Sequence, residues 1–188
     1  MIIKTKMKNI FKLTLSFIKN IALVFILAFF IKYFLVQTFL VDGVSMMPNY
    51  KDNDFVIVDK VSYQLREPQR GEIIVFKPKL NQDVNYIKRI IGLPGDKIVI
   101  KSGHIFVNSK ELIEPYIDGN DTYVENKIDY LFTKTLSDDE YFVLGDNRNN
   151  SQDSRAIGPI SKENITGRVI LVIYPFSDAR LVRASEGF

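Results

Sequence analysis

Ser45 stands in the stretch GVSMMP (residues 43–48), directly after the longest apolar run of the chain. A serine hydroxyl becomes an effective nucleophile only when a base lies within hydrogen-bond reach. The chain has one histidine, His104, which follows a Ser102-Gly103 pair typical of a hairpin turn. We expect the His104 side chain to be solvated there, so the sequence argues against a Ser-His-Asp triad.

Lys88 is the alternative base for Ser45. It lies in YIKRII (residues 86–91), a β-type run in which Lys88 shares one face with Tyr86 and Ile90. Apolar neighbours would lower the pKa of the lysine by desolvation. At an ordinary pKa near 10.4 roughly one lysine in 2,500 is neutral at pH 7, whereas a pKa of about 8 makes it roughly one in ten. The pattern alone also allows a strand lysine whose amine reaches solvent.

The composition narrows the chemistry further. The 188-residue chain has no cysteine, which excludes disulfides, cysteine nucleophiles and thiolate metal sites. No cluster of His, Asp and Glu has metal-ligand spacing, and we expect no cofactor. Residues 1–41 contain six lysines and no acid, whereas the whole chain has a net charge of +3. The rest of the chain therefore carries about −3. A nucleic-acid-binding domain carries its own basic surface, so we expect no nucleic-acid partner.

The apolar run is IALVFILAFFIKYFLVQTFLV (residues 21–41), with Lys32 as its only charge. As a helix it would span roughly 31 Å, enough to cross the hydrocarbon core of a bilayer. The lysines that precede it, without acids, predict a cytoplasmic N-terminus. We therefore expect a basic cytoplasmic segment (1–12), a single transmembrane anchor (13–38) and an extracytoplasmic catalytic domain (39–188). A cleaved signal peptide and a buried core helix are the alternatives.

The rest of the chain predicts a mainly β domain. Short β-rich runs alternate with turn signals, and no amphipathic helix of convincing length follows Gly43. Residues 114–139 are polar and irregular, and we expect a surface excursion there. The expected strands are 54–61, 72–76, 86–91, 97–100, 104–107, 141–144 and 168–174.

Four segments, in order behind the apolar run, resemble the type I signal peptidases, the membrane-anchored Ser/Lys proteases of family S26. SMMP (45–48) is similar to the nucleophile motif, and GEIIVF (71–76) is similar to the second box, with glutamate where aspartate is usual. YIKRIIGLPGD (86–96) is similar to the lysine box, and GDNRNNSQDSR (145–155) to the last box. The glycine at 43, the short chain and the single anchor resemble the Gram-positive-type branch. The resemblance implies a signal-peptidase-like β domain with one N-terminal transmembrane helix.

The resemblance implies roles for the residues around the nucleophile. Ser45 would attack the scissile carbonyl, Lys88 would be the general base, and Ser151 would hydrogen-bond and orient the lysine amine. The Ser45 backbone N–H would form part of the oxyanion hole. In one branch of the family a serine two residues earlier adds a second donor. Gly43 stands there, so a backbone N–H or a water would have to serve. Asn49 replaces the threonine often found after the proline, and we expect little consequence.

Other matched residues would support the site or contact the substrate. Asp153 and Arg155 would pair and hold the active-site loop. Arg89 would pair with an acid such as Asp146. The family cleaves exported preproteins after small residues at positions −1 and −3, which requires shallow apolar pockets. The first pocket would be lined by Val41, Met46, Tyr50, Tyr86 and Ile87, and the second by Phe39, Val56, Ile74 and Ile87.

The implied enzyme is a signal peptidase I at the outer face of the membrane. We expect a monomer whose partners are signal peptides and the lipid bilayer. A Ser/Lys peptidase with one dedicated substrate, such as a pilin-maturation enzyme, shares the chemistry. The self-cleaving SOS repressors share the dyad and the fold, but they carry a soluble DNA-binding domain where this chain has its apolar run. An inactive anchored paralogue should lack Ser45 or Lys88, and both are present.

Overall fold

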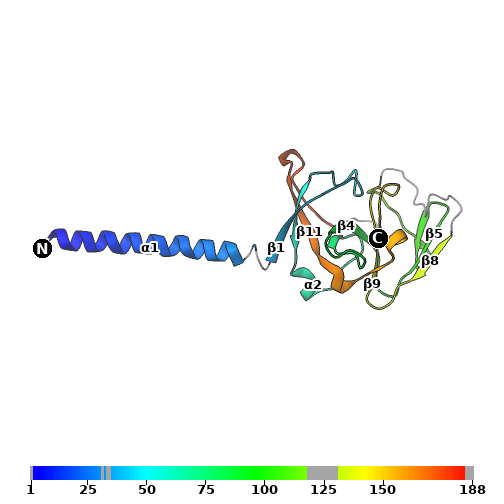
Figure 1. The fold of residues 1–188 in the computed structure, drawn as a ribbon, viewed down its shortest axis with the longest axis horizontal. Helices are drawn as coiled ribbons and strands as arrows, with labels where there is room; N and C mark the ends of the chain where they lie inside the picture. The colour runs from blue at the N-terminus through cyan, green and yellow to red at the C-terminus, as the bar shows by residue number, and fades with distance from the viewer. Residues whose placement is uncertain (1, 31, 33–34, 118–130, 185–188) are drawn as a thin grey trace.

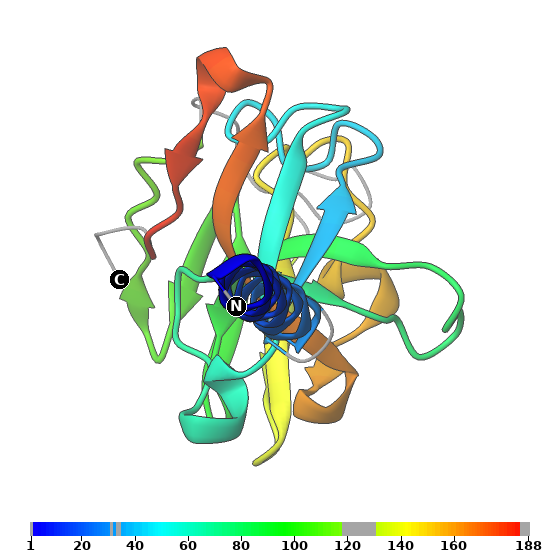
Figure 2. The ribbon, with the colours of Figure 1, turned by 90° about the vertical axis from the view of Figure 1, so that its left-hand side faces the viewer.

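The computed structural model describes residues 2–30, 32, 35–117 and 131–184, with side chains from residue 14 onward. Figure 1 shows a long N-terminal helix, α1 (Ile2–Phe30), that projects from a domain built almost wholly of β-strands. Viewed along its axis, α1 lies in front of the middle of that domain (Figure 2). The mainly β class predicted from the short strand-like runs is confirmed.

The helix differs from the one expected over residues 21–41. It begins at Ile2 and ends at Phe30, and the last part of the apolar run forms strand β1 (Val36–Leu40) instead. This strand pairs along its whole length with β2 (Phe55–Asp59), so sheet pairing decides its conformation. Among the described residues, no helix has both the length and the apolar character needed to cross a membrane.

The larger sheet holds eight antiparallel strands within the described residues, in the order β1-β2-β11-β3-β4-β9-β10, and β12 pairs with β11. Strand β4, which carries Lys88, therefore lies inside the sheet between β3 and β9. Besides β1 and β2, the members are β3 (Ile73–Phe76), β4 (Tyr86–Gly92), β9 (Glu140–Leu144), β10 (Ile160–Ser161), β11 (Ile165–Tyr174) and β12 (Arg180–Leu181).

A second sheet has four described strands in the order β7-β6-β5-β8. They are β5 (Lys97–Lys101), β6 (His104–Val107), β7 (Lys110–Glu111) and β8 (Phe132–Thr135). The turn between β5 and β6 is the predicted hairpin. Ser102 and Gly103 adopt φ values of 50° and 82°, as a two-residue type I′ turn requires. Strand β8 lies in the range expected to be irregular, of which residues 118–130 fall outside the described part of the chain.

Short helices complete the domain. Among the described residues after Gly43, no α-helix exceeds four residues, in agreement with the sequence prediction. The elements are α2 (Ser62–Leu65), α3 (Ser154–Ile157) and the 3-10 helices η2 (Lys162–Asn164) and η3 (Phe176–Asp178).

The core explains why β3 is a continuous apolar run. All four of its residues are buried. Ile73 and Val75 pack into one cluster, together with Met46 from the loop that carries Ser45. Ile74 and Phe76 pack into a second cluster. A strand that is covered on both faces needs apolar residues at every position. The centre of the larger sheet therefore lies between the two core clusters.

Candidate active site

Ser45 lies in the loop that connects the antiparallel strands β1 and β2. The loop is held at its centre by Met46, which is fully buried in the first core cluster. Hydrogen bonds from the Met47 N–H to the Val44 carbonyl (3.1 Å) and from the Tyr50 N–H to the Met46 carbonyl (2.9 Å) close turns around the serine. The position of Ser45 is therefore set by the side chain that follows it.

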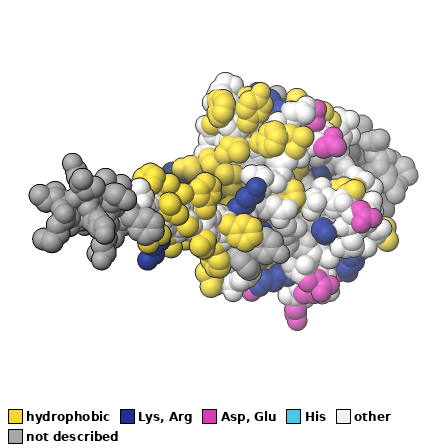
Figure 3. Space-filling model, turned by 60° about the vertical axis from the view of Figure 1, so that its left-hand side comes forward, with side chains coloured by type: hydrophobic (Ala, Val, Ile, Leu, Met, Phe, Trp, Pro, Cys, Tyr) yellow, Lys and Arg dark blue, Asp and Glu magenta, His cyan; other side chains and the backbone are white. Residues whose placement is uncertain are grey.

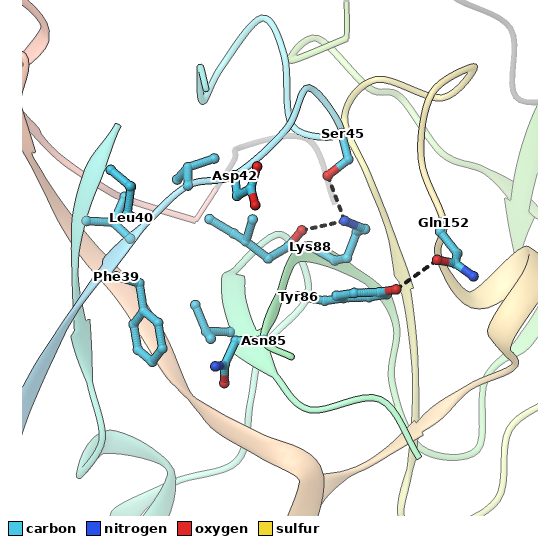
Figure 4. Close-up of a pocket in the computed structure, with 12 residues that line it drawn as sticks. Phe39, Leu40, Asp42, Ser45, Asn85, Tyr86, Lys88 and Gln152 are labelled. Atoms are coloured by element: carbon cyan, nitrogen blue, oxygen red, sulfur yellow. Dashed lines mark hydrogen bonds between the residues drawn. The ribbon is translucent and has the colours of Figure 1, made fainter. Parts of the chain in front are cut away.

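Lys88 projects from β4 toward this loop. Its Nζ lies 2.7 Å from Ser45 Oγ, and it donates to the Ile87 carbonyl at 2.8 Å (Figure 4). Only 4% of Lys88 is exposed, so the alternative of an amine that reaches solvent is wrong. Because β4 is an inner strand, the neighbouring strands fix the backbone from which the Lys88 side chain extends.

Burial lowers the pKa of Lys88 to about 8. Desolvation of the ammonium is the largest cause, and the negative charges of Asp153 and Asp146 act in the opposite direction. At pH 7 such an amine is neutral in roughly one molecule in ten. The neutral amine has a lone pair and lies within proton-transfer distance of Ser45 Oγ, at 2.7 Å.

The segment after β9 clamps the nucleophile loop. The Asn147 N–H donates to the Ser45 carbonyl at 3.0 Å, and Asn147 Nδ2 donates to the Val44 carbonyl at 3.1 Å. A Cβ at Gly145 would overlap the Ser45 carbonyl oxygen and the Ser151 hydroxyl, so only glycine allows this close approach. Sequence reasoning gave Asn147 no role, although it lies in the motif quoted above.

Arg89 points away from Lys88 and forms a buried ion pair with Asp146. Arg89 Nε and one terminal nitrogen donate to the two Asp146 oxygens at 2.8 Å and 2.7 Å, so the predicted pairing is present. The guanidinium also donates to the Gly71 carbonyl at 3.1 Å and lies over the Tyr116 ring, 3.9 Å from its centroid. This bidentate geometry is the strong form of an ion pair, and it ties β4 to the segment after β9.

Asp153 and Arg155 also form the predicted pair, at 2.8 Å. Asp153 is fully buried, accepts a bond from the Gly145 N–H (3.1 Å) and caps helix α3. Arg155 donates in addition to the Arg148 carbonyl at 2.7 Å. The pair therefore fastens both ends of the loop that contacts Ser45.

Ser151 differs from its predicted role. Its hydroxyl is buried, and among the described residues it has no hydrogen-bond partner. The predicted hydrogen bond from Ser151 to the lysine amine is therefore absent. Lys88 Nζ bonds instead to Ser45 and to the Ile87 carbonyl.

The Gly43 N–H is one backbone candidate for the second oxyanion donor, which the sequence left open. This N–H donates to Asp52 Oδ1 at 2.7 Å and is therefore occupied. Gly43 has a φ of 95°, and a Cβ there would meet no atom within 4 Å, so the glycine is explained by backbone conformation. The Ser45 N–H makes no hydrogen bond within the described part of the chain.

A cavity of about 350 Å³ opens beside the serine and the lysine. Figure 4 shows Phe39 and Leu40 of β1 on one side and Tyr86 of β4 on another, with Tyr86 donating to Gln152 at 2.7 Å. Five of the residues predicted to contact substrate line this cavity: Phe39, Val41, Val56, Tyr86 and Ile87. The other lining residues, which the sequence did not indicate, are Leu40, Asp42, Val75, Asn85 and Gln152.

Three predicted pocket residues do not line the cavity. Met46 and Tyr50 are buried in the first core cluster, and Ile74 is buried in the second. Successive residues of a strand point to opposite faces, and Val75, the neighbour of Ile74, reaches the cavity instead. For β3, the predicted pocket residue was therefore Ile74, whereas its neighbour Val75 lines the cavity.

His104 is exposed, as predicted, and pairs with Glu111 at 2.8 Å on the second sheet.

A buried pair that the sequence did not indicate lies closer to the site. Arg148 donates to Glu114 at 2.8 Å and to the Gly145 carbonyl at 3.1 Å. Glu114 falls in the segment expected to be an irregular excursion, so no periodic pattern marked it.

Comparison with known families identifies the family of this chain. Residues 14–174 match the family described as signal peptidase, peptidase S26, and the chain belongs to that family. The family predicted from the four motifs is confirmed.

Individual relatives are similar over most of the chain. A probable signal peptidase I-2 from Synechocystis is 40% identical over 162 residues, covering 84% of this chain and 72% of the relative. Signal peptidase I S from Bacillus subtilis is 37% identical over 175 residues, covering 90% of this chain and 94% of the relative. A crystal structure of a signal peptidase I from Enterococcus faecalis is 32% identical and covers 55% of this chain and 97% of that chain, with a TM-score of 0.47.

Proposed function

We propose that this chain is a membrane-bound serine endopeptidase, a signal peptidase I, that removes N-terminal signal peptides from exported preproteins. The observation that carries the proposal is the 2.7 Å distance between Ser45 Oγ and Lys88 Nζ, beside a cavity with both apolar and polar walls. Membership of the signal peptidase family supports it.

In this mechanism the neutral Lys88 amine accepts the proton of Ser45 as the serine oxygen attacks the scissile carbonyl. The lysine then protonates the leaving amine, and an acyl-enzyme remains on Ser45. Lys88 next deprotonates a water, which hydrolyses the ester and restores the serine. The buried amine suits this cycle because its pKa of about 8 lies close to physiological pH.

The Ser45 N–H is our candidate oxyanion donor. It lacks a hydrogen-bond partner among the described residues, so it can bond the negative oxygen of the tetrahedral intermediate. The Gly43 N–H cannot take this part while Asp52 holds it. A water or a substrate group must then provide any second donor.

The cavity supports a preference for small side chains at positions −1 and −3 of the signal peptide. Phe39, Val56 and Ile87 are three of the side chains around a space of about 350 Å³. Apolar walls bind alanine-sized groups and exclude larger ones by steric overlap. We therefore propose cleavage after small-x-small sequences such as Ala-x-Ala.

We further propose that α1, whose side chains the structure describes only from residue 14 onward, anchors the enzyme in the membrane with its N-terminus in the cytoplasm and the β domain outside. The described part of α1 presents large apolar side chains without protein cover; Phe25 is 72% exposed and Ile26 is 66% exposed. Figure 3 shows such side chains continuing from the helix onto the adjoining face of the domain. Enzyme and substrate would share one bilayer, which raises their effective concentration, and a monomer suffices for the reaction.

A cleavage assay tests the activity. The full chain in detergent is mixed with a secretory preprotein that carries an Ala-x-Ala site, and mass spectrometry identifies the new N-terminus. We expect cleavage by the natural chain and by the exposed-residue controls Lys97→Ala and Ser137→Ala, and loss of cleavage in Ser45→Ala and Lys88→Ala. Wild-type cleavage by either dyad variant would refute the mechanism. Cleavage of one dedicated preprotein only would favour a specialised peptidase.

A further inference from the structure

Asn49 lies four residues after Ser45 on the same loop and ties that loop to other parts of the chain. Its Nδ2 donates to Asp146 Oδ2 at 2.9 Å and to the Tyr116 carbonyl at 2.6 Å. Its backbone carbonyl accepts a hydrogen bond from Arg180 of β12. Both amide hydrogens of Asn49 are therefore used, each on a different segment of the chain.

The acceptor Asp146 is the carboxylate that holds Arg89. Asp146 is 1% exposed, and Arg89 bonds both of its oxygens, at 2.8 Å and 2.7 Å. The Arg89 guanidinium lies over the ring of Tyr116, the residue whose carbonyl is the second acceptor for Asn49. A continuous path of direct contacts therefore runs from the nucleophile loop through Asn49 and Asp146 to Arg89 on β4.

Two asparagines hold the nucleophile from its two sides. Asn147 bonds the carbonyls of Val44 and Ser45 and fixes the beginning of the turn. Asn49 fixes the end of the turn against the ion pair next to Lys88 in sequence. Without Asn49, the end of the turn would keep the buried Met46 side chain and the Arg180 contact but would lose its direct bond to the ion pair.

We propose that Asn49 is a positioning residue for the peptidase reaction, which fixes the end of the nucleophile loop against the Asp146–Arg89 pair and so sets the distance between Ser45 Oγ and Lys88 Nζ. The proposal rests on the peptidase function above. Asn49 acts through these contacts and touches neither reacting atom. Displacement of a reacting group by about 1 Å can cost about a hundredfold in rate.

A shift of the nucleophile loop would also change the surroundings of the lysine amine, because Lys88 is 4% exposed and its Nζ contacts Ser45 Oγ on that loop. If the loop loosens, water reaches Lys88, desolvation weakens, and the pKa of Lys88 rises toward its ordinary value. The titratable and charged groups around Lys88 are all retained in the sequence of an Asn49 variant. They are Tyr86 on β4, Asp146 and Asp153 on the segment after β9, and Asp42 in the cavity.

The test compares Asn49→Ala, Asn49→Thr and the exposed control Asn81→Ala in the full chain. We expect Asn49→Ala to lower kcat at least about tenfold with KM changed less than twofold, because substrate contacts remain. Threonine keeps one hydroxyl donor, but its oxygen lies one bond nearer the backbone than Asn49 Nδ2, so Asn49→Thr should recover only part of the loss. Asn81→Ala should match the natural chain.

A second measurement does not depend on activity. NMR of lysine-labelled protein follows the Lys88 signal, identified by its disappearance in Lys88→Met. We expect its pKa to rise in Asn49→Ala and to rise less in Asn49→Thr. A folded Asn49→Ala with unchanged kcat and unchanged Lys88 pKa would overturn the proposal. So would a decrease in thermal stability and kcat that leaves the Lys88 pKa unchanged. If Asn49→Ala does not fold, Asn49→Thr and Asn49→Ser carry the comparison. If the natural chain cleaves no preprotein, the function fails, while the titration still judges the positioning.

Discussion

Lys88 Nζ and Ser45 Oγ lie 2.7 Å apart although the two residues are held by different supports. The lysine comes from an inner strand whose neighbours are β3 and β9. The serine comes from a loop that the buried Met46 side chain pins to the core. The distance between Lys88 Nζ and Ser45 Oγ therefore depends on how firmly the nucleophile loop is fixed to the sheet. Substitutions that shift this loop should change the rate of cleavage.

The pH dependence of cleavage should follow Lys88. Burial lowers its pKa to about 8, and only the neutral amine can accept the serine proton. We expect kcat/KM to increase about tenfold per pH unit below that value and to level above it. Rates measured from pH 6 to 10 with a substrate that does not titrate there check this. A profile that is flat from pH 6 to 9, or that rises only near 10.5, would contradict it.

Removal of the Asp146 carboxylate should destabilise the fold. Asp146→Ala leaves the Arg89 guanidinium buried without its counter-ion, at 4% side-chain exposure. Breaking such a pair costs about 3–5 kcal/mol in the free energy of unfolding. Urea denaturation measures the change. Asp178→Ala, which removes the exposed partner of Lys51, is the matched control and should have a much smaller effect.

Gly145→Ala should impair the reaction. A methyl group there would overlap the Ser45 carbonyl oxygen and the Ser151 hydroxyl, so the nucleophile loop must shift. We expect kcat to decrease about a hundredfold in protein that retains its circular dichroism spectrum. Wild-type kcat in this variant would mean that the contact between the two loops is not tight in solution.

Ile87→Ala should relax the preference for small residues. Ile87 lines the cavity, and its truncation makes room for a longer side chain. Preproteins with alanine, valine or leucine at −1 or −3 would be compared. We expect the preference for alanine over valine to weaken about tenfold at one of the two positions. The control Ile113→Ala, at a 70% exposed position, should keep the natural preference.

The inner strands were predictable and the outer ones were not. Strands β2, β3, β4 and β9 bury apolar residues and produce recognisable runs. The strands missed from sequence are β1, β7, β8, β10 and β12, and each lies at an edge of its sheet or pairs with one neighbour. The short outer strands β7, β8, β10 and β12 carry little apolar pattern, and both residues of β7 are exposed. Strand β1 was missed for another reason, because it belongs to the apolar run that was assigned to the anchor.

The candidate site likewise contains residues that could be predicted from the sequence and residues that could not. Ser45 and Lys88 were found because chemistry restricts the residue types, and the apolar setting of Lys88 predicted the direction of its pKa shift. Asn147 was given no role and Asn49 was expected to have little consequence, because their contacts depend on carbonyl positions that only the folded loops define. The resemblance implied that Ser151 orients the Lys88 amine, and that hydrogen bond is absent among the described residues. It left the second oxyanion donor open at Gly43, whose N–H bonds Asp52.

Strand β1 leads directly into the nucleophile loop and pairs with β2 from Val36↔Asp59 to Leu40↔Phe55. Tension that enters from the helix side would meet the Val36 end first. It would have to unzip the ladder to Leu40 before it displaced the loop. Pulling forces on α1 would therefore displace Ser45 only after all five residue pairs between β1 and β2 have opened.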